Sequence, residues 1–277
     1  MMSNERFVTL ANGVQFPTMG LGVYKAEDGS EVKQAVHTAL EAGYRGIDTA
    51  SVYGNETGVG EALHEAEIPR EDITVASKVW NDEQGYEETL AAFERSRQRL
   101  GLEVLDMYMI HWPVPGKFQE TWRALEKLYQ DGHVRAIGVS NFQKHHLEEL
   151  KETANTMPML NQVEFHPLLF QKELLDYCQE NNIQMQSWRP LTQGELLEHD
   201  VVREIASGVR KDPAQVLLRW HLQHGLVTIP KSVTPKRIQK NIDVFDFELT
   251  PADMARLDQL HEDRRFGPHP DTFDYEQ

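Results

Sequence analysis

The sequence predicts an α/β protein folded as a (β/α)8 barrel of the TIM type, with an N-terminal β-hairpin capping the barrel. Eight short apolar segments rich in β-branched residues recur along the 277 residues and alternate with longer segments of helical periodicity. Such alternation implies parallel strands joined by right-handed crossovers, and eight units favour closure into a barrel. An open doubly wound sheet is the alternative. No linker-like or repetitive segment marks a boundary, so residues 1–277 are interpreted as one domain.

The individual elements follow from periodicity and from turn residues. The predicted strands are Met19–Val23, Gly46–Thr49, Ile73–Ser77, Met107–Ile110, Ala136–Val139, Gln162–Glu164, Gln184–Trp188 and Val227–Ile229. Helices such as Glu31–Ala42 and Phe118–Gln130 carry one apolar face and stop before a glycine, as helix C-termini commonly do. The segment Arg6–Thr18 contains an Asn12-Gly13 turn, which predicts the hairpin that covers the barrel floor.

Charge and composition restrict the kinds of partner. The formal net charge of −16 argues against nucleic acid or an anionic membrane surface, because both would be repelled. No apolar run approaches the ~20 residues that span a bilayer, and the N-terminus lacks an export signal. The single cysteine, Cys178, fits a reducing compartment and a position in the core. We therefore expect a cytoplasmic protein, a monomer or at most a weak dimer, with a small-molecule partner.

Reactive side chains fall at the C-terminal ends of the predicted strands, where barrel enzymes place their active sites. Asp48, Lys78 and His111 each end a strand, and Tyr53 follows five residues after Asp48. We expect Asp48 and Lys78 to pair, because each charge alone would be costly in the barrel mouth. A tyrosine beside that lysine should have its pKa lowered from ~10, which would make Tyr53 an acid, while His111 could hydrogen-bond a carbonyl oxygen.

A basic segment follows the eighth strand. Residues 231–240 hold four basic side chains and no acidic one, in a chain that is acidic overall. Thr234 and Pro235 are typical of the N-cap and first position of a helix, whose free N–H groups attract anions. Barrels often bind phosphate at this place, so the segment predicts a phosphate site.

Two further patterns are given a structural interpretation. The spacing of His221 and His224 would suit a metal on one helix face, but without a third ligand both are predicted to be surface histidines. Gly58 and Gly60 lack the third glycine and the preceding strand of a dinucleotide-binding motif. We interpret them as a loop that leads into a helix.

The order and content of these segments resemble the aldo-keto reductase family, and bacterial members that reduce diketogluconate or methylglyoxal in particular. The resemblance covers nearly the whole chain. The matching motifs are Gly46–Glu56, Ser77–Asn81, Ile110–Pro113, Gly138–Phe142 and Ile229–Ile238.

The resemblance implies NADPH-dependent reduction of small aldehydes and ketones by direct hydride transfer, without a metal. It implies a catalytic tetrad of Asp48, Tyr53, Lys78 and His111, with Tyr53 as proton donor. Ser140, Asn141 and Gln162 would hold the nicotinamide carboxamide, with Trp188 stacked on the ring. The remaining cofactor contacts would come from Arg189, Leu191, Lys231, Ser232, Val233, Thr234, Arg237 and Asn241. Tyr24, Trp80, His111 and Trp112 would line the substrate pocket.

The chain departs from the family pattern at two cofactor positions. Arg189 follows the stacking aromatic where a small residue is usual, and this long cation could reach the cofactor diphosphate or crowd it. Lys240 stands where glutamate often precedes the adenine-binding asparagine. Both changes bear on cofactor affinity and on the preference for NADPH over NADH.

Two other functions are compatible with parts of the pattern. A lysine in a barrel mouth can form a Schiff base, so Lys78 could serve an aldolase-type lyase. A cofactor-binding protein without activity, reporting redox state to a partner, is the second alternative, although an intact tetrad argues against it.

Overall fold

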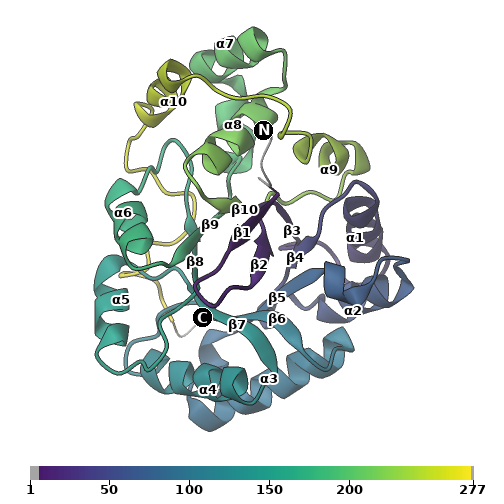
Figure 1. Cartoon of the computed structure of the whole chain (residues 1–277), viewed down its shortest axis with the longest axis vertical. Helices are drawn as coiled ribbons and strands as arrows, with labels where there is room; N and C mark the ends of the chain where they lie inside the picture. Colours follow the sequence, from purple (N-terminus) through teal and green to yellow (C-terminus); the bar gives the residue numbers. More distant parts are fainter. Residues whose placement is uncertain (1–5, 276–277) are drawn as a thin grey trace.

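In the computed structural model, which describes residues 6–275, eight parallel strands close into a barrel surrounded by helices (Figure 1). The hydrogen-bonded order runs from β3 to β10 in chain order, and every neighbouring pair is parallel. Parallel bridges from Met19 to Thr228 and from Gly22 to Lys231 join the first barrel strand to the last. These bridges close the cylinder, which confirms the predicted barrel and excludes the open sheet.

The barrel strands are short, and each is followed by at least one helix. The strands are β3 (Gly20–Gly22), β4 (Gly46–Asp48), β5 (Thr74–Val79), β6 (Leu105–Ile110), β7 (Val134–Ser140), β8 (Leu160–Glu164), β9 (Gln184–Trp188) and β10 (Val227–Thr228). The α-helices are α1 (Ser30–Glu41), α2 (Glu56–Glu65), α3 (Tyr86–Leu100), α4 (Phe118–Gln130), α5 (Lys144–Lys151), α6 (Lys172–Glu180), α7 (Asp200–Val209), α8 (Pro213–Gln223), α9 (Pro235–Asn241) and α10 (Pro251–Asp258). Short 3₁₀ helices are η1 (Ser51–Tyr53), η2 (Arg70–Asp72), η3 (Asn81–Glu83) and η4 (Thr192–Glu198).

All eight predicted strands are present, and the bounds of all but β9 differ from the predicted ones by one or two residues at one or both ends. Strand β7 begins two residues earlier than expected, because the exposed Arg135 interrupts the apolar pattern while its backbone stays in the sheet. Helix α4 and strand β9 have the predicted bounds. Within residues 6–275, no helix combines the length and the apolar character needed to cross a membrane.

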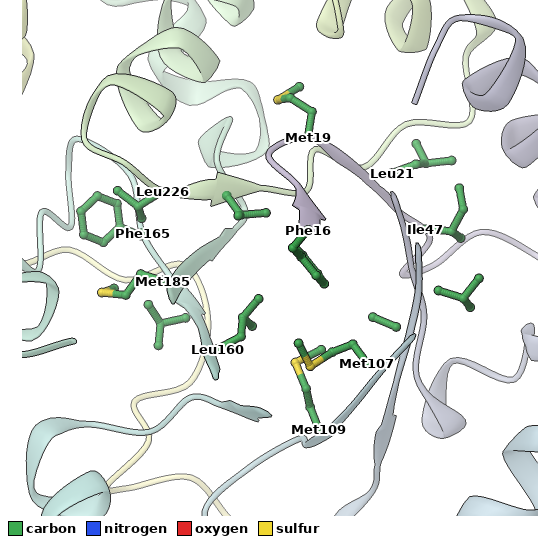
Figure 2. Packing of buried hydrophobic residues seen from close by; sticks show 14 of the residues in the cluster. Phe16, Met19, Leu21, Ile47, Met107, Met109, Leu160, Phe165, Met185 and Leu226 are labelled. Carbon is green, nitrogen blue, oxygen red and sulfur yellow. The ribbon is translucent and has the colours of Figure 1, made fainter. Parts of the chain in front are cut away.

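The predicted hairpin lies across the N-terminal end of the barrel. Strands β1 (Phe7–Thr9) and β2 (Gln15–Pro17) pair antiparallel, and Gly13 adopts the left-handed φ of 86° that the turn requires. Asn12 Nδ2 donates to the carbonyl of Arg135 at 2.9 Å, which fixes the turn beside the start of β7. The Phe16 side chain points into the barrel toward Met107 and Leu160 (Figure 2), so the hairpin both caps and fills the floor.

Gly58 and Gly60 lie inside helix α2, so their interpretation as a loop is wrong. The helix already begins at Glu56. A Cβ at Gly58 would come within 2.5 Å of Val32, and one at Gly60 within 2.4 Å of the Leu100 carbonyl oxygen. The two glycines therefore let α2 approach α1 and the end of α3 closely. Close packing of helices, and not a loop, explains why glycine stands at both positions.

The prediction of two surface histidines is wrong for His221. This residue is fully buried, because it lies on the face of α8 that is turned toward the barrel. Its Nδ1 lies 2.7 Å from the carbonyl oxygen of Leu217 and its Nε2 lies 2.9 Å from that of Phe165, so both ring nitrogens already face backbone oxygens. His224 is half-buried, with Nε2 2.8 Å from Asp258 Oδ1. Cys178 is a buried core residue, as predicted.

The close approach of α2 to α3 gives a stability prediction. We expect Gly60→Ala to lower the free energy of unfolding by about 1–3 kcal/mol, because the new methyl group would overlap backbone atoms that cannot move independently. Gly208→Ala, in the exposed part of α7 with no atom within 4 Å, is the matched control and should stabilise by about 0.5–1 kcal/mol. Urea denaturation followed by circular dichroism measures both, and equal effects of the two substitutions would contradict the packing explanation.

Candidate active site

A buried ion pair between Asp48 and Lys78 lies at the C-terminal ends of β4 and β5. Lys78 Nζ donates to Asp48 Oδ1 at 2.6 Å and to the Thr49 carbonyl oxygen at 2.9 Å. Both side chains are almost completely removed from solvent. Because an unpaired charge is costly in such surroundings, each group supports the charged state of the other. This pairing is the one expected from the sequence.

The aromatic side chains of Tyr53 and His111 lie next to the ion pair. Tyr53 is the last residue of η1, the short helix that follows β4, and its ring centroid lies 5.2 Å from Lys78 Nζ. His111, directly after β6, meets the Tyr53 ring edge-on with 5.7 Å between centroids. The structure therefore brings together all four residues proposed for the tetrad.

The pKa of Tyr53 is shifted in the direction opposite to the one expected from the sequence. Burial raises the pKa well above its ordinary value of 10.0, and the negative charge of Asp48 and the neighbouring Tyr24 phenol raise it further. The ammonium of Lys78 is directed at Asp48 and Thr49 and does not offset these effects. In this structure Tyr53 is thus a firmly protonated phenol, and the expectation of a lowered pKa is wrong.

His111 is a neutral imidazole at physiological pH. Burial, and to a lesser extent the positive charge of Lys78, lower its pKa well below the ordinary value of 6.5. Its ring stands edge-on against Trp80 at 4.9 Å between centroids, and its Nδ1 has no hydrogen-bond partner among residues 6–275. A neutral imidazole carries one N–H, so it can donate one hydrogen bond without bringing a further charge into the site.

These groups face a cavity of about 460 Å³ in the mouth of the barrel. Asp48, Tyr53 and His111 contribute to its wall, whereas Lys78 does not. The aromatic residues that were predicted to contact substrate, Tyr24, Trp80 and Trp112, all line it. The cavity therefore combines an aromatic wall with polar groups that can orient a ligand, as is typical of small-molecule sites.

A hydrogen-bonded set of polar side chains forms another wall of this cavity. Ser140 ends β7 and Asn141 follows it, Gln162 lies in the middle of β8, and Trp188 ends β9. Trp188 Nε1 donates to Asn141 Oδ1 at 2.9 Å, and Asn141 Nδ2 donates to the His111 carbonyl oxygen at 2.9 Å. Gln162 Nε2 donates to Asp48 Oδ2 at 2.8 Å, so the amide wall and the ion pair are directly connected.

A second cavity, of about 420 Å³, lies beyond β10 and shares Lys231 with the first. It is lined by five of the residues predicted to bind the cofactor: Leu191, Lys231, Ser232, Arg237 and Asn241. Thr234 is the N-cap of α9 and Pro235 its first residue, as predicted, but Thr234 and Val233 line neither of the two cavities. Lys240 lines the second cavity and forms an ion pair with Asp212 on the same wall.

Arg189 stands at the edge of the first cavity, two residues before Leu191 of the second. Its guanidinium lies over the Trp188 ring at 5.4 Å, and its buried Nη1 has no hydrogen-bond partner among the described residues. Its backbone has a left-handed φ of 54°, as do Thr192 (49°) and Gln193 (55°). This unusual backbone, costly for residues with a Cβ, turns the chain between the two cavities.

The C-terminal segment supplies part of the cavity wall that the sequence did not reveal. Pro268 and Phe273 line the cavity, and Phe273 stacks on Trp112 with 4.3 Å between ring centroids. The buried carboxylate of Glu164, at the end of β8, accepts hydrogen bonds from the backbone N–H groups of Phe266 and Gly267. A glycine is needed at 267, since a Cβ there would lie 2.4 Å from the Trp188 ring. Only a three-dimensional arrangement could show that this segment folds back over the mouth.

Fold and site together define a barrel enzyme whose mouth holds acid and hydrogen-bonding side chains, beside a second cavity lined by cationic residues. The model of the aldo/keto reductase family matches residues 15–262, and the chain belongs to this family. It is 59% identical over 271 residues to the uncharacterized oxidoreductase YtbE of Bacillus subtilis (strain 168), covering 96% of this chain and 97% of that protein. It is 57% identical over 264 residues to the glyoxal reductase of the same organism, covering 95% and 96%.

A solved structure extends this likeness to three dimensions. The crystal structure of a Gox0644 mutant in complex with NADPH superposes with a TM-score of 0.93 at 42% identity, covering 97% of this chain and 98% of that one. The expected family is thus confirmed, and the chain is an oxidoreductase of the aldo-keto reductase type.

Proposed function

We propose that this protein uses NADPH to reduce small aldehydes and ketones to alcohols, with Tyr53 as the proton donor. Methylglyoxal, diketogluconate-like compounds and aromatic carbonyls are the proposed substrates, in keeping with the glyoxal reductase among its relatives. The observation that carries the proposal is the placement of a protonated phenol and a neutral imidazole beside a buried Lys–Asp pair, in one cavity. A cytoplasmic enzyme, monomeric or weakly dimeric, is part of the same proposal.

The two connected cavities fit the two ends of a dinucleotide phosphate. Ser140, Asn141 and Gln162 would hold the carboxamide and Trp188 the ring of nicotinamide, which supplies hydride to the carbonyl carbon when NADPH is bound. Lys231, Ser232 and Arg237 would bind the adenosine 2′-phosphate, since a guanidinium can contact phosphate through two hydrogen bonds, and Asn241 the adenine. The unpartnered Nη1 of Arg189, between the two cavities, is the observation of this structure that best supports an anionic ligand there.

Each proposed catalytic group has a role that follows from its protonation state. Tyr53 keeps its proton until negative charge develops on the carbonyl oxygen, which is then a much stronger base than a phenolate. The neutral imidazole of His111 orients that oxygen by one hydrogen bond. The ammonium of Lys78, 5.2 Å from the Tyr53 ring centroid, stabilises the phenolate that remains after the transfer. Asp48 keeps that ammonium in place.

The Schiff-base alternative loses support from the position of Lys78. Its Nζ is bonded to Asp48 and to the Thr49 carbonyl oxygen, the side chain is fully buried, and it does not line the cavity. An amine nucleophile must be deprotonated and must reach the carbonyl carbon. Lys78 does not meet the second requirement here, because it is buried outside the cavity, and a positioning role fits better.

The proton-donor role is tested by Tyr53→Phe. We expect carbonyl-dependent oxidation of NADPH to fall by about 10²–10⁴-fold, because the general acid is removed while the cavity keeps its shape. Binding of NADP⁺, measured by calorimetry, should be nearly unchanged. Tyr24→Phe is the matched control, since this phenol lies in the same cavity, 4.9 Å from the Tyr53 ring, and should retain most activity. A Tyr53→Phe variant with near-normal turnover of methylglyoxal would refute the role.

The shifted pKa values predict a flat pH profile for carbonyl reduction. The pKa of Tyr53 lies above 10.0, so the phenol keeps its proton as pH rises to that value, and that of His111 lies below 6.5, so the imidazole stays neutral above it. We therefore expect kcat/KM with a non-ionising aldehyde to stay nearly constant between these two values. Initial rates at saturating NADPH measure it. A single-proton decline centred near pH 7–8 would show that one of these groups titrates where the structure says it does not.

The unpartnered guanidinium predicts a cofactor-binding effect of Arg189→Ser. We expect the Kd for NADP⁺ to rise about tenfold or more, because a charge-assisted bond to the diphosphate is lost. Binding of adenosine 2′,5′-bisphosphate, which lacks the nicotinamide-side phosphate, should change much less. Arg210→Ser is the matched control, because Arg210 has nearly the same left-handed φ (56°) but is exposed and lines neither cavity. Tighter NADP⁺ binding by Arg189→Ser would show instead that the cation crowds the cofactor.

A further inference from the structure

Two histidines of helix α5 and an aspartate of the C-terminal segment bring three potential metal ligands together outside the barrel mouth. His145 and His146 lie in the first turn of α5, and Asp271 lies opposite them. His145 Nε2 is 3.2 Å and His146 Nε2 is 3.7 Å from the same oxygen, Asp271 Oδ1. All three ligand atoms lie within 4.8 Å of one another. None of these residues lines the cavity that holds Tyr53.

The separations suit a shared metal ion better than a network of hydrogen bonds. The 3.7 Å between His146 and Asp271 is too long for a hydrogen bond, and so is the 3.9 Å from His269 Nδ1 to Asp271 Oδ2. Ligand atoms bound tetrahedrally to Zn²⁺ at ~2.0–2.1 Å lie about 3.3 Å from each other. The Asp271 Oδ1 atom, facing two imidazole nitrogens at 3.2 and 3.7 Å, therefore has nearly the spacing of a coordination shell.

The state of the side chains also favours a cation. His146 is nine-tenths buried, so its ring is already held in one place beside Asp271. The neighbouring cation, Lys144, is directed elsewhere: its Nζ lies over the Tyr177 ring, 5.5 Å from the ring centroid. The opposing factor is the hydrogen bond, 3.0 Å long, that His146 Nδ1 accepts from the Gln143 backbone N–H. Coordination through Nε2 requires the ring proton to sit on Nδ1, so this bond has to break and the Gln143 N–H has to turn to water when the metal binds.

We propose that His145, His146 and Asp271 bind one divalent transition-metal ion, Zn²⁺ being the best match, and that this ion ties the C-terminal segment to helix α5. Nitrogen and carboxylate ligands in this ratio are those that Zn²⁺ accepts, with the fourth position left to water. His269 is not counted as a ligand, because its Nδ1 accepts a hydrogen bond from the Asp271 backbone N–H at 3.2 Å. The site is structural, and the chemistry at Tyr53 does not involve it.

A tie at Asp271 would act on the substrate cavity through the segment that carries it. Phe273, two residues further on, stacks on Trp112 and lines the cavity, and Pro268, three residues before, lines it as well. Glu164 already holds the segment at Phe266 and Gly267. A second fixed point at Asp271 would leave little freedom to the wall between them.

Metal binding is tested on the full-length, tag-free protein after treatment with a chelator. We expect Zn²⁺ titration by calorimetry to give one site per chain with a roughly micromolar Kd, and Co²⁺ to give the visible absorption of a four-coordinate ion. His145→Ala and Asp271→Asn should each weaken binding by about tenfold or more. His37→Ala is the matched control, because His37 also lies 3.2 Å from a carboxylate, that of Glu65, but belongs to no three-ligand group among residues 6–275. Thermal unfolding verifies that the variants fold.

A second measurement follows the C-terminal segment itself. Saturating Zn²⁺ should slow backbone hydrogen exchange in residues 264–275 of the natural sequence and leave exchange in Asp271→Asn unchanged. The proposal is overturned if no Zn²⁺ binds at up to roughly 100 μM, if His145→Ala and Asp271→Asn bind as the unaltered chain does, or if binding leaves exchange in this segment unaffected. Neither measurement uses carbonyl turnover. If the metal-site proposal fails, the proposed reductase activity is therefore unaffected.

Discussion

The Asp48 carboxylate is the group on which the rest of the site depends, because each of its two oxygens binds a side chain from a different strand. Oδ1 accepts a hydrogen bond from Lys78 on β5, and Oδ2 accepts one from Gln162 on β8, on the opposite side of the barrel. These bonds are buried, so breaking any of them would leave an unpaired polar group away from water. The barrel mouth is therefore fixed in shape by one side chain before any ligand enters.

Burial, and to a lesser extent the same carboxylate, explain why the pKa of Tyr53 is raised rather than lowered. A sequence shows that a lysine, an aspartate and a tyrosine meet, but not toward which partner the ammonium points. Here the ammonium is engaged by Asp48 and Thr49, and burial outweighs what remains of its field at the phenol. In the proposed mechanism, the phenol would therefore be made effective as an acid by the base that it meets, an oxygen gaining full negative charge, and the surrounding groups would only stabilise the resulting phenolate.

The sequence was sufficient for features set by local pattern and insufficient for those set by distant contacts. Apolar periodicity predicted all eight barrel strands, and because strand ends meet at one rim, it also predicted that Asp48, Lys78 and His111 would lie together. The burial of His221 depends on the rotation of α8 against the barrel, and the role of Gly60 depends on where α3 ends. The C-terminal wall required knowing that Glu164, a hundred residues earlier, binds the backbone of Phe266.

Local charge balance at the second cavity bears on the two departures from the family pattern. Of the basic side chains in 231–240, Lys240 is engaged by Asp212, which leaves Lys231 and Arg237 as the cations lining this cavity among the described residues. The charge of Lys240 is thereby balanced by Asp212. This chain thus has a carboxylate, that of Asp212, on the cavity wall beside position 240, where the family often has glutamate. Since the chain as a whole carries a charge of −16, a polyanionic cofactor can be retained only where such local cations outweigh the general field. Arg189, placed between the cavities and without an acidic partner in the part of the chain described, extends that positive region along the path a diphosphate would take.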